Sequence, residues 1–342
     1  MHCRLLVPNL IPSAMPGMPL RQVLPEGLAT LLKFGLVTKT AGNEMADWLC
    51  AAFGVERQQD NPVAPFALLG DDGLPGDGYW LRADPVTVRL MRNQLILFAD
   101  SANAPSAAEA AEFVAALNRH FAPDGLHFSA PHPHRWYLRL PAVPKLHTHS
   151  LARANGRNIQ HFLPSGEESA PWRKLLNEAQ MLLHQHPLNA AREAAGLLPV
   201  NSIWLWGGGT LSARLSAPCN RLYADDPLAR GLALAAGIPT APLPPALPEN
   251  EGKMTGATLF VAHHLRDTMW QEEAWRIGLE RLDEEWLAPA TNALRQGKLQ
   301  RLTLIAPGES ATADLTLTRS DLWKIWRRGK SLADLFQFAI KT

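Results

Sequence analysis

The sequence is poor in cysteine and almost free of net charge. Its only cysteines are Cys3, Cys50 and Cys219. Their odd number and wide spacing give no support to a disulfide framework or a structural zinc site, and favour reduced, buried thiols in the cytoplasm. The 33 basic and 32 acidic side chains leave a formal net charge of +1. This balance gives no electrostatic reason to expect nucleic acid or a membrane as a partner.

Long apolar runs and internal repeats are also missing from the sequence. No uninterrupted apolar stretch has the length that a transmembrane helix needs. The apolar run at 5–11 is interrupted by Pro8 and followed at once by Pro12, so it is too short and broken for a signal helix. We predict a first core strand at 3–7 instead. A length of 342 residues, 46% of them hydrophobic, supports one large or two moderate cores.

The order of predicted elements indicates two lobes. We expect a loop at 60–78, and Asn43 as the N-cap of a helix that ends near residue 52. A lobe of strands and helices follows, in which Ser106 and Glu109 form a capping box. Its predicted strands are 80–88, 94–98, 127–128 and 135–140, and its predicted helices are 106–120 and 171–186.

Beyond residue 200, strands and helices alternate, which is typical of a parallel sheet with helical cover. The predicted elements there are strands at 203–206, 258–262 and 299–306, and helices at 226–236 and 267–294. We therefore predict an α/β fold with a mainly parallel sheet and helices on both faces. Its core would comprise 1–78 and 200–342, and a smaller α/β lobe would be inserted at 79–199.

The stretch 186–209 carries the most specific pattern. Asn189 and Arg192 would share one helix face, and the apolar run at 203–206 suits a strand that is buried on both sides. Three glycines follow, and they allow the backbone to turn and expose amide groups that can hold an anion. The alternative is a core strand followed by a tight turn. These glycines are Gly207, Gly208 and Gly209.

The residue pattern of this stretch resembles a known family signature. From Asn189 to Gly209 it matches N-x-x-R-x-x-x-G-x-x-P-A-N-x-I-W-x-W-G-x-G, with Val200 in place of alanine. This signature is typical of archaeal-type, cofactor-independent phosphoglycerate mutases of the alkaline-phosphatase superfamily. Residues 82–88 are similar to the family's R-A-N-x-V-T-V strand, and Arg135 to the arginine of its Y-R-H segment. The resemblance implies an alkaline-phosphatase-like core with an inserted substrate lobe.

The catalytic motifs of that family are not matched. The family uses two divalent metal ions and a serine nucleophile. Asn9 stands where an aspartate is usual, Asn43 falls at the nucleophile position, and an amide cannot accept a phosphoryl group. The last core strand runs into Ala306 and Pro307 instead of Asp-His-Ser-Thr. We therefore predict no catalytic residue, no metal and no cofactor. The remnant of a metal motif comprises His263, His264 and Asp267.

Our hypothesis is a cytoplasmic, catalytically inactive phosphoglycerate-mutase-like protein with a regulatory or ligand-sensing role, similar to bacterial RpfE-type regulatory proteins. It would bind a small phosphorylated acid, because guanidinium groups suit phosphate and carboxylate. Alternatively, each arginine pairs with a carboxylate of the fold, such as Asp84, Glu193 or Asp100. The candidate ligand-binding residues are Arg82, Arg135, Asn189, Arg192, Asn201, Gly207, Gly208 and Gly209.

Two other functions stay open. One is an active phosphoglycerate mutase or phosphatase with relocated metal ligands, drawn from Asp71, Asp72, His149, His263, His264 and Asp267. The other is a protein-interaction scaffold that uses the proline-rich connector at 238–248 or exposed tryptophans. Six histidines between 127 and 161 are predicted to be surface or packing residues. The tryptophans predicted to lie in the core are Trp204, Trp206, Trp270, Trp275 and Trp286.

Overall fold

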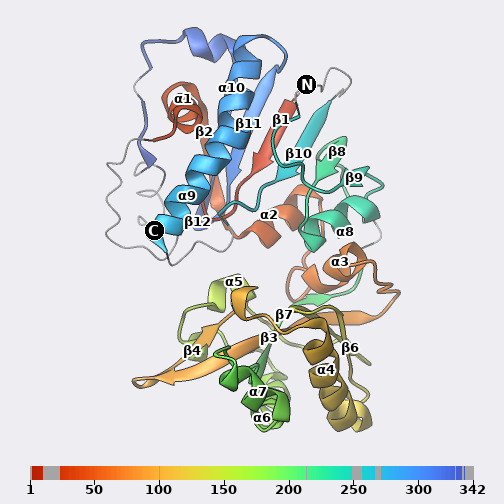
Figure 1. Cartoon of the computed structure of the whole chain (residues 1–342). Coiled ribbons are helices and arrows are strands. Elements are labelled where there is room, and N and C mark those ends of the chain that lie inside the picture. The colour runs from red at the N-terminus through yellow and green to blue at the C-terminus, as the bar shows by residue number, and fades with distance from the viewer. Residues whose placement is uncertain are drawn as a thin grey trace. The chain divides into compact units, whose positions relative to one another are not determined.

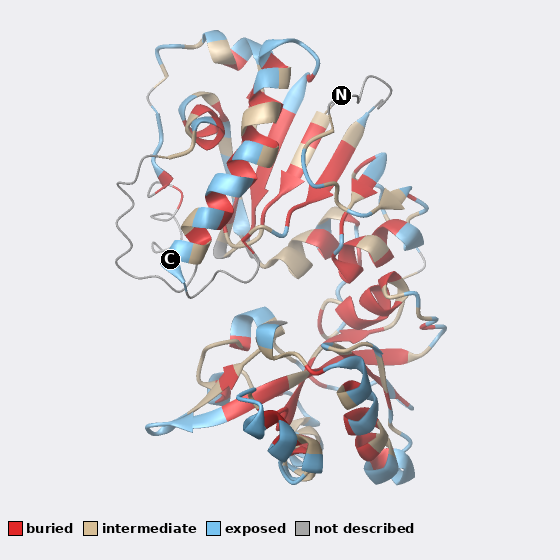
Figure 2. Ribbon diagram, in the orientation of Figure 1, coloured by how far each residue is buried: buried red, intermediate tan, exposed pale blue. Residues whose placement is uncertain are grey.

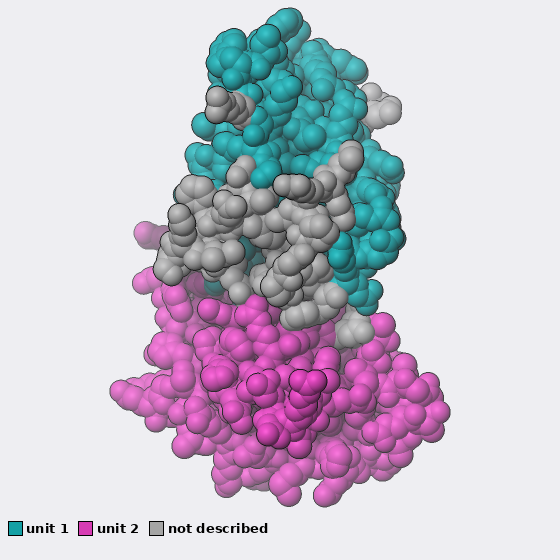
Figure 3. Space-filling model, turned by 90° about the vertical axis from the view of Figure 1, so that its left-hand side faces the viewer, with its two compact units in different colours: residues 1–54, 215–342 teal, residues 55–214 magenta. Residues whose placement is uncertain are grey.

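The chain divides into two compact units (Figure 3). Unit 1 comprises Met1–Gly54 and Leu215–Thr342, and unit 2 comprises Val55–Arg214. The computed structural model describes residues 2–10, 24–99, 101–212, 214–248, 256–265, 271–327, 329–332 and 335. Within these ranges, no helix is both long and apolar enough to cross a membrane.

Unit 1 is built on a seven-stranded sheet with the order β2-β12-β11-β1-β10-β8-β9 (Figure 1). Strand β1 lies between β10 and β11 and is parallel to both, whereas β12 is antiparallel to β11 and β2. The predicted α/β fold with a mostly parallel sheet is therefore confirmed. The strands are β1 (His2–Leu6), β2 (Leu36–Asn43), β8 (Arg221–Tyr223), β9 (Thr240–Ala241), β10 (Ala257–Val261), β11 (Arg301–Ala306) and β12 (Gly308–Thr318).

Helices α1, α9 and α10 lie over one face of this sheet (Figure 1). The apolar side chains of that face, such as Leu5 and Leu304, pack against Trp286 in one buried cluster. Asp283 accepts hydrogen bonds from the amides of Gly27 (3.1 Å) and Leu28 (2.7 Å), which would otherwise be unpaired at the start of α1. The helices are α1 (Glu26–Phe34), α2 (Met45–Ala52), α8 (Pro227–Ala235), α9 (Glu272–Leu282) and α10 (Ala288–Arg295).

Unit 2 contains an antiparallel sheet in which β3 pairs with β4, β6 and β7, and β5 pairs with β6. Its strands are β3 (Tyr79–Met91), β4 (Gln94–Phe98), β5 (His127–His132), β6 (Arg135–Leu140) and β7 (Ser202–Gly209). Helices α4 and α6 supply much of its apolar cluster, and burial follows their inward faces (Figure 2). The helices are α3 (Val63–Gly70), α4 (Ala107–Phe121), α5 (Leu151–Ala154), α6 (Ser169–His184) and α7 (Pro187–Ala194).

The predicted capping box is confirmed, because Ser106 caps α4 together with Glu109. Other helix ends also carry local capping residues, and Asp226 caps α8 with its side chain. Gly196 follows α7 with φ 75°, so it supplies the left-handed backbone that ends a helix. Short-range signals therefore placed these helix ends, because capping depends on a few neighbouring residues.

Other predictions of local structure are wrong. The expected loop at 60–78 contains α3, because all but one of its residues are buried in unit 2 despite the prolines around it. Asn43 does not cap α2: it is the last residue of β2, and Glu44 precedes the helix. The long helix predicted at 267–294 is interrupted by a π-helical segment at Asp283–Leu287, and its start lies outside the described residues.

The boundaries of the units differ from those predicted at 79 and 199. Strand β7 does not start the parallel core sheet but pairs antiparallel with β3, and α3 packs on both strands. A run of apolar residues suits any strand that is covered on both faces. It therefore could not distinguish a central antiparallel strand from a parallel one.

Candidate functional site

Three neighbouring strands of unit 2 bring Arg82 between two aromatic rings. In the strand register, Arg82 on β3 lies opposite Tyr137 on β6 and opposite Trp206 on β7. The guanidinium carbon is 5.0 Å from the ring centroid of Tyr137 and 5.5 Å from that of Trp206. Both distances fall within the range of cation–π attraction. The sheet thus holds a cation on one face, close to the α3 end of the unit.

Asp84 neutralises this cation. Its Oδ1 atom is 2.5 Å from Nη2 and 3.1 Å from Nε of Arg82, and its Oδ2 accepts a hydrogen bond of 2.7 Å from the indole of Trp206. Burial lowers the pKa of Arg82, but Asp84, Tyr137 and Asp71 together outweigh burial and raise this pKa above its ordinary value. Arg82 is therefore paired with Asp84, which is the alternative stated above for this arginine.

Arg135 lies on the same face and has its own carboxylate, Asp71. The Nε and Nη2 atoms of Arg135 bond this carboxylate at 2.9 Å and 2.7 Å, and the hydroxyl of Tyr137 donates to it at 2.7 Å. Burial raises the pKa of Asp71, yet the hydrogen bonds from Arg135 and Tyr137 outweigh burial and leave this pKa below its usual value. The structure thus brings the two predicted arginines together, along with two carboxylates and two aromatic rings.

A second polar cluster surrounds Thr148. The Thr148 amide and hydroxyl donate to Oδ2 of Asp60 at 2.9 Å and 2.5 Å, and the amide of Gly207 donates to the same hydroxyl at 3.2 Å. The carbonyl of His149 accepts a hydrogen bond of 2.8 Å from Trp204. Burial is the largest influence on Asp60 and raises its pKa. Thr148 therefore connects β7 to the loop that precedes α3.

The three glycines of β7 serve close packing instead of a turn. A Cβ atom on Gly208 would lie 2.6 Å from the hydroxyl of Tyr79, and one on Gly209 would lie 2.4 Å from Cβ of Pro62. Only Gly207 has a positive φ, 64°, and its amide is bonded to Thr148. The predicted turn is wrong, because these residues continue the strand against the start of α3.

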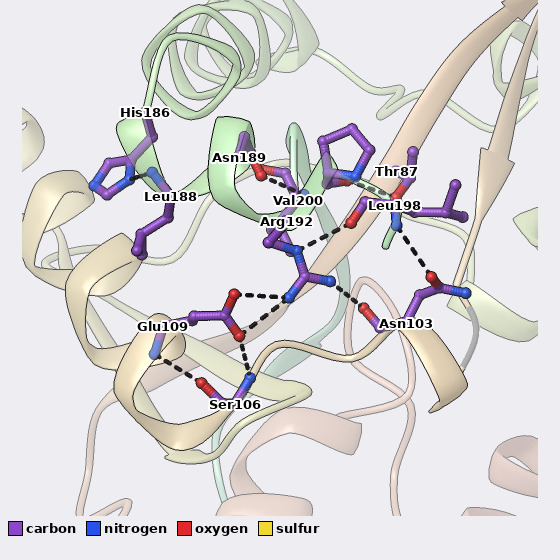
Figure 4. A network of polar contacts seen from close by, with 11 residues as sticks. Thr87, Asn103, Ser106, Glu109, His186, Leu188, Asn189, Arg192, Leu198 and Val200 are labelled. Carbon is purple, nitrogen blue, oxygen red and sulfur yellow. Dashed lines mark hydrogen bonds and ion pairs between the residues drawn. The ribbon is translucent and has the colours of Figure 1, made fainter. Parts of the chain in front are cut away.

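Arg192 is the centre of a separate network that is enclosed by the fold (Figure 4). Its Nη1 atom is 3.1 Å from both carboxylate oxygens of Glu109, its Nη2 donates to the carbonyl of Asn103 at 2.6 Å, and its Nε donates to that of Leu198 at 3.0 Å. Glu109 is held in turn by the amide of Ser106. The side chain of Arg192 is 2% exposed. These contacts favour a structural role, and ligand binding by Arg192 stays a prediction.

The two asparagines of the signature act as substitutes for backbone pairing. The side-chain amide nitrogen of Asn189 donates to the carbonyls of Leu183 (2.8 Å) and Val200 (3.0 Å). The side-chain oxygen of Asn189 accepts a hydrogen bond from the backbone amide of Val200 (2.8 Å). The Asn201 side chain exchanges a pair of hydrogen bonds with the backbone of Val88 at 2.8 Å and 2.9 Å. Both are buried, so they position the connection between α7 and β7. Their predicted contact with a ligand stays a prediction.

Among the described residues of unit 1, few metal-binding groups lie at the carboxyl ends of the parallel strands. After β1, the side-chain amide of Asn9 donates to the carbonyl of Leu265 at 3.2 Å. The backbone carbonyl of Asn9 accepts a hydrogen bond of 3.1 Å from the Trp275 indole. His264 lies 2.6 Å from Glu285, and burial lowers the pKa of this histidine.

The resemblance also marked Pro307, Asp267 and His263. Pro307 joins β11 directly to β12, and Asp267 lies outside the described residues. His263 is 3.6 Å from Asp225. Among the residues that the structure describes, no three histidine, cysteine or acidic side chains converge as metal ligands. The donor set present there does not fit a pair of divalent cations.

Sequence reasoning missed several members of these clusters. Tyr137 and Asp60 had no pattern that marked them, because their roles depend on contacts made across strands and loops. Trp206 was assigned to the core, yet it is only partly buried and contacts both members of the Arg82 pair. The alternation of side chains along β3 and β7 was the one available signal, since it places Arg82 and Trp206 on a common face only when the register is known.

Comparisons with known proteins agree with the resemblance. A family model of 2,3-bisphosphoglycerate-independent phosphoglycerate mutase matches residues 74–189. The mutase of Methanosarcina barkeri is 38% identical over 68 residues, 20% of this chain and 17% of that one. A probable mutase of Geobacter sulfurreducens is 27% identical over 196 residues, 54% of this chain and 48% of that one. The chain thus matches at most about half the length of these relatives.

The likeness in fold extends further than the likeness in sequence. The PH0037 protein of Pyrococcus horikoshii superimposes with a TM-score of 0.51 over 99% of this chain and 92% of that chain, at 14% identity. Fold and sequence together show an α/β protein that is similar to phosphoglycerate mutases. The match to the family model lies within residues of unit 2.

Proposed function

We propose that this chain has lost phosphoryl transfer and serves a regulatory or ligand-sensing role in the cytoplasm, of the kind suggested by its resemblance to RpfE-type proteins. The observation that carries the proposal is the end of β11. There Ala306 pairs with Ala313 of β12, so the chain folds back through Pro307 as antiparallel sheet where the family places an Asp-His-Ser-Thr motif. Alanine and proline side chains offer neither a metal ligand nor a proton donor.

The same argument applies after β1, where Asn9 is bound to Leu265 and Trp275. An amide in that position donates one hydrogen bond to a loop and brings no negative charge to a cation. These two strand ends are adjacent because β1 and β11 are paired. The proposal therefore rests on two neighbouring positions that both have structural contacts.

The ligand that we propose is a small phosphorylated acid, bound in unit 2 on the face that carries Arg82 and Arg135. The relatives are named as phosphoglycerate mutases, and forked guanidinium groups bind phosphate and carboxylate through paired hydrogen bonds. Such a ligand has to compete with Asp84 and Asp71, which occupy both arginines in the structure. We therefore expect weak binding that responds to changes in either carboxylate.

The test combines metal analysis, turnover and ligand binding on the purified chain. We expect no stoichiometric manganese or zinc, no mutase or phosphatase turnover, and an increase in melting temperature with 3-phosphoglycerate. Arg135→Met should remove the increase, whereas Arg119→Met, an exposed arginine on α4 of the same unit, should retain it. Turnover that depends on bound metal would overturn the proposal of an inactive protein. If 3-phosphoglycerate does not raise the melting temperature, the proposed binding of a small phosphorylated acid is wrong.

A protein-interaction scaffold is the second candidate, favoured by three large apolar side chains near the end of the described chain. Trp323, Ile325 and Trp326 are each about three-quarters exposed. An active enzyme with relocated ligands has less support, because Asp71 is held by Arg135 and Tyr137.

A further inference from the structure

The segment that follows β12 exposes its apolar side chains and folds its charges inward. Trp323, Ile325 and Trp326 are 76%, 77% and 75% exposed. By contrast, the side chains of Lys324 and Arg327 between and after them are only 35% and 28% exposed. This arrangement reverses the usual one, in which large apolar groups are covered and charged groups face water. It is typical of a surface that has a partner.

The exposure does not arise from a loosely held backbone. Thr318 and Asp321 form a capping box at the 3₁₀ turn Arg319–Trp323. The Asp321 carboxylate is 2.7 Å from Nζ of Lys324 and 3.2 Å from Nη1 of Arg327.

The segment is also tied to α1. Arg327 donates a short hydrogen bond to the carbonyl of Phe34, and the amide of Lys330 donates to that of Leu32 at 3.1 Å. The segment is thus fixed at both ends, and its three apolar side chains point outward from a defined frame.

The charge around these side chains has one sign. Between residues 319 and 330 the sequence contains five basic residues and one acidic residue, Asp321. That carboxylate is itself buried and bound to two of the cations. Lys33 of α1 lies beside this segment, next to Gly329. The whole chain has a net charge of only +1, so this local excess of positive charge was hidden in the overall balance.

We propose that the segment formed by Trp323, Lys324, Ile325, Trp326, Arg327 and Lys330, which we call the aromatic-basic segment, binds the surface of an anionic lipid bilayer. Tryptophan rings favour the boundary between water and hydrocarbon, where the ring is buried and the indole N–H stays hydrated. Basic side chains beside them are attracted to anionic headgroups.

The alternation of cations and large apolar side chains in one short segment favours a lipid surface over a soluble anion. A soluble phosphate would engage the cations and leave the two indole rings and the isoleucine exposed to water. This role is independent of ligand binding in unit 2, and it reverses our expectation from net charge that no membrane takes part.

The test uses the full chain and two kinds of vesicle. We expect the chain to sediment with vesicles of phosphatidylcholine mixed with phosphatidylglycerol, and much less with vesicles of phosphatidylcholine alone. Added salt should weaken binding, because screening reduces the attraction between exposed charges. Brominated lipids should quench part of the tryptophan fluorescence, since the quencher acts only on rings that reach the acyl boundary.

Three variants assign the binding to this segment. The double change Trp323→Ala and Trp326→Ala should weaken binding more than about tenfold, because two aromatic side chains lose their burial. Lys330→Ala should weaken it about fivefold and reduce its dependence on salt. Leu74→Ala with Leu90→Ala, which shortens two exposed apolar side chains of unit 2, should bind as the unchanged chain does.

Several outcomes would overturn the proposal. Equal sedimentation with both vesicle types, no sedimentation with either, or unchanged binding by the tryptophan variant would each do so. A tryptophan variant that changes the oligomeric state, together with no lipid binding by the unchanged chain, would assign the segment to a protein interface. If the tryptophan variant fails to fold, quenching in the unchanged chain and the Lys330→Ala result decide, because neither requires removal of a ring.

Discussion

Unit 2 contains two buried arginines whose partners lie at different distances along the sequence. Arg192 bonds the carbonyls of Asn103 and Leu198 and the carboxylate of Glu109, so it joins α7 to segments that are far away in the sequence. Arg82 bonds a carboxylate only two residues along its own strand. A contact between distant segments restricts the fold, whereas a contact within one strand adds little to that restriction.

This difference is the basis for our proposal that Arg82, and not Arg192, binds a ligand. The carboxylate of Asp84 also accepts a bond from Trp206 of β7, so a ligand that replaces it has to replace that contact too. Replacing Glu109 would release the start of α4 as well, because Glu109 is also part of the capping box there. Both arginines lie in stretches that resemble the family, so only the contacts distinguish the two roles.

Removing Arg192 should have the largest effect on stability. Arg192→Met leaves the carboxylate of Glu109 and two carbonyls without their partner, and we expect a loss of about 3–4 kcal/mol in the free energy of unfolding. Urea unfolding monitored by circular dichroism measures this loss. The exposed Arg119→Met is the matched control, expected within about 0.5 kcal/mol of the unchanged chain. Equal stability of both variants would contradict a structural role for Arg192.

Asp84→Asn tests the other arginine and restores the residue that the family carries there. The amide removes the negative charge and keeps a single oxygen, whereas Arg82 and Trp206 donate to different oxygens of Asp84. One of the two donors therefore loses its acceptor, and we expect a loss of about 2–3 kcal/mol. We also expect tighter binding of 3-phosphoglycerate, because Arg82 then lacks a competing anion. Calorimetric titration measures the affinity. Weaker binding than in the unchanged chain would show that Asp84 orients the ligand instead of competing with it.

The sequence predicted most elements but misplaced the signature strand. The predicted capping box at Ser106 is confirmed, and the helix ends at Asp226 and Gly196 also follow local capping rules. The unit to which β7 belongs depends on its pairing with β3, more than 100 residues earlier. No local pattern encodes such a pairing. The α/β class was therefore predictable, whereas the boundary between the units was not.

For the candidate site, the sequence supplied positions but not partners. Arg82 and Arg135 were marked by resemblance to the family, and one of the carboxylates suggested as partners, Asp84, is bound to Arg82. The partner of Arg135 is Asp71, which follows α3 in a stretch that we expected to be a loop. Because α3 was not predicted, Asp71 was not recognised as the partner of Arg135. Helix α3 is buried because it packs against β3 and β7. Such contacts between separate elements are not encoded in a local sequence pattern.

The glycines of β7 give a smaller but sharper test of the same region. Gly208→Ala places a methyl group 2.6 Å from the Tyr79 hydroxyl, without the obstacle of a positive φ, and we expect a loss of about 1–3 kcal/mol from overpacking. Gly196→Ala meets open space but has φ 75°, so its cost of about 1 kcal/mol is purely conformational. Thermal unfolding compares the two. A harmless Gly208→Ala would indicate that β7 does not need close contact with the side chains of Tyr79 and Leu81 on β3.

The smallest expected effect concerns pH and separates the two carboxylates of the site. Although burial raises the pKa of Asp71, the bonds from Arg135 and Tyr137 hold this pKa below its value in the unfolded chain. The folded state therefore binds this proton less readily than the unfolded state does. Its contribution to stability is complete above the unfolded pKa of about 4, and is lost as the pH falls through the lower pKa of the folded state.

Asp71→Asn removes this contribution, so its free energy of unfolding should change less steeply below about pH 4 than that of the unchanged chain. Urea unfolding at a series of acidic pH values measures the two slopes. Glu109, whose pKa is lowered by its bonds to Ser106 and Arg192 despite the opposing effect of burial, leaves part of the slope in both chains. Identical slopes would mean that the pKa of Asp71 is the same in the folded and the unfolded chain. The bonds from Arg135 and Tyr137 would then not favour the charged form of Asp71 beyond the opposing effect of burial.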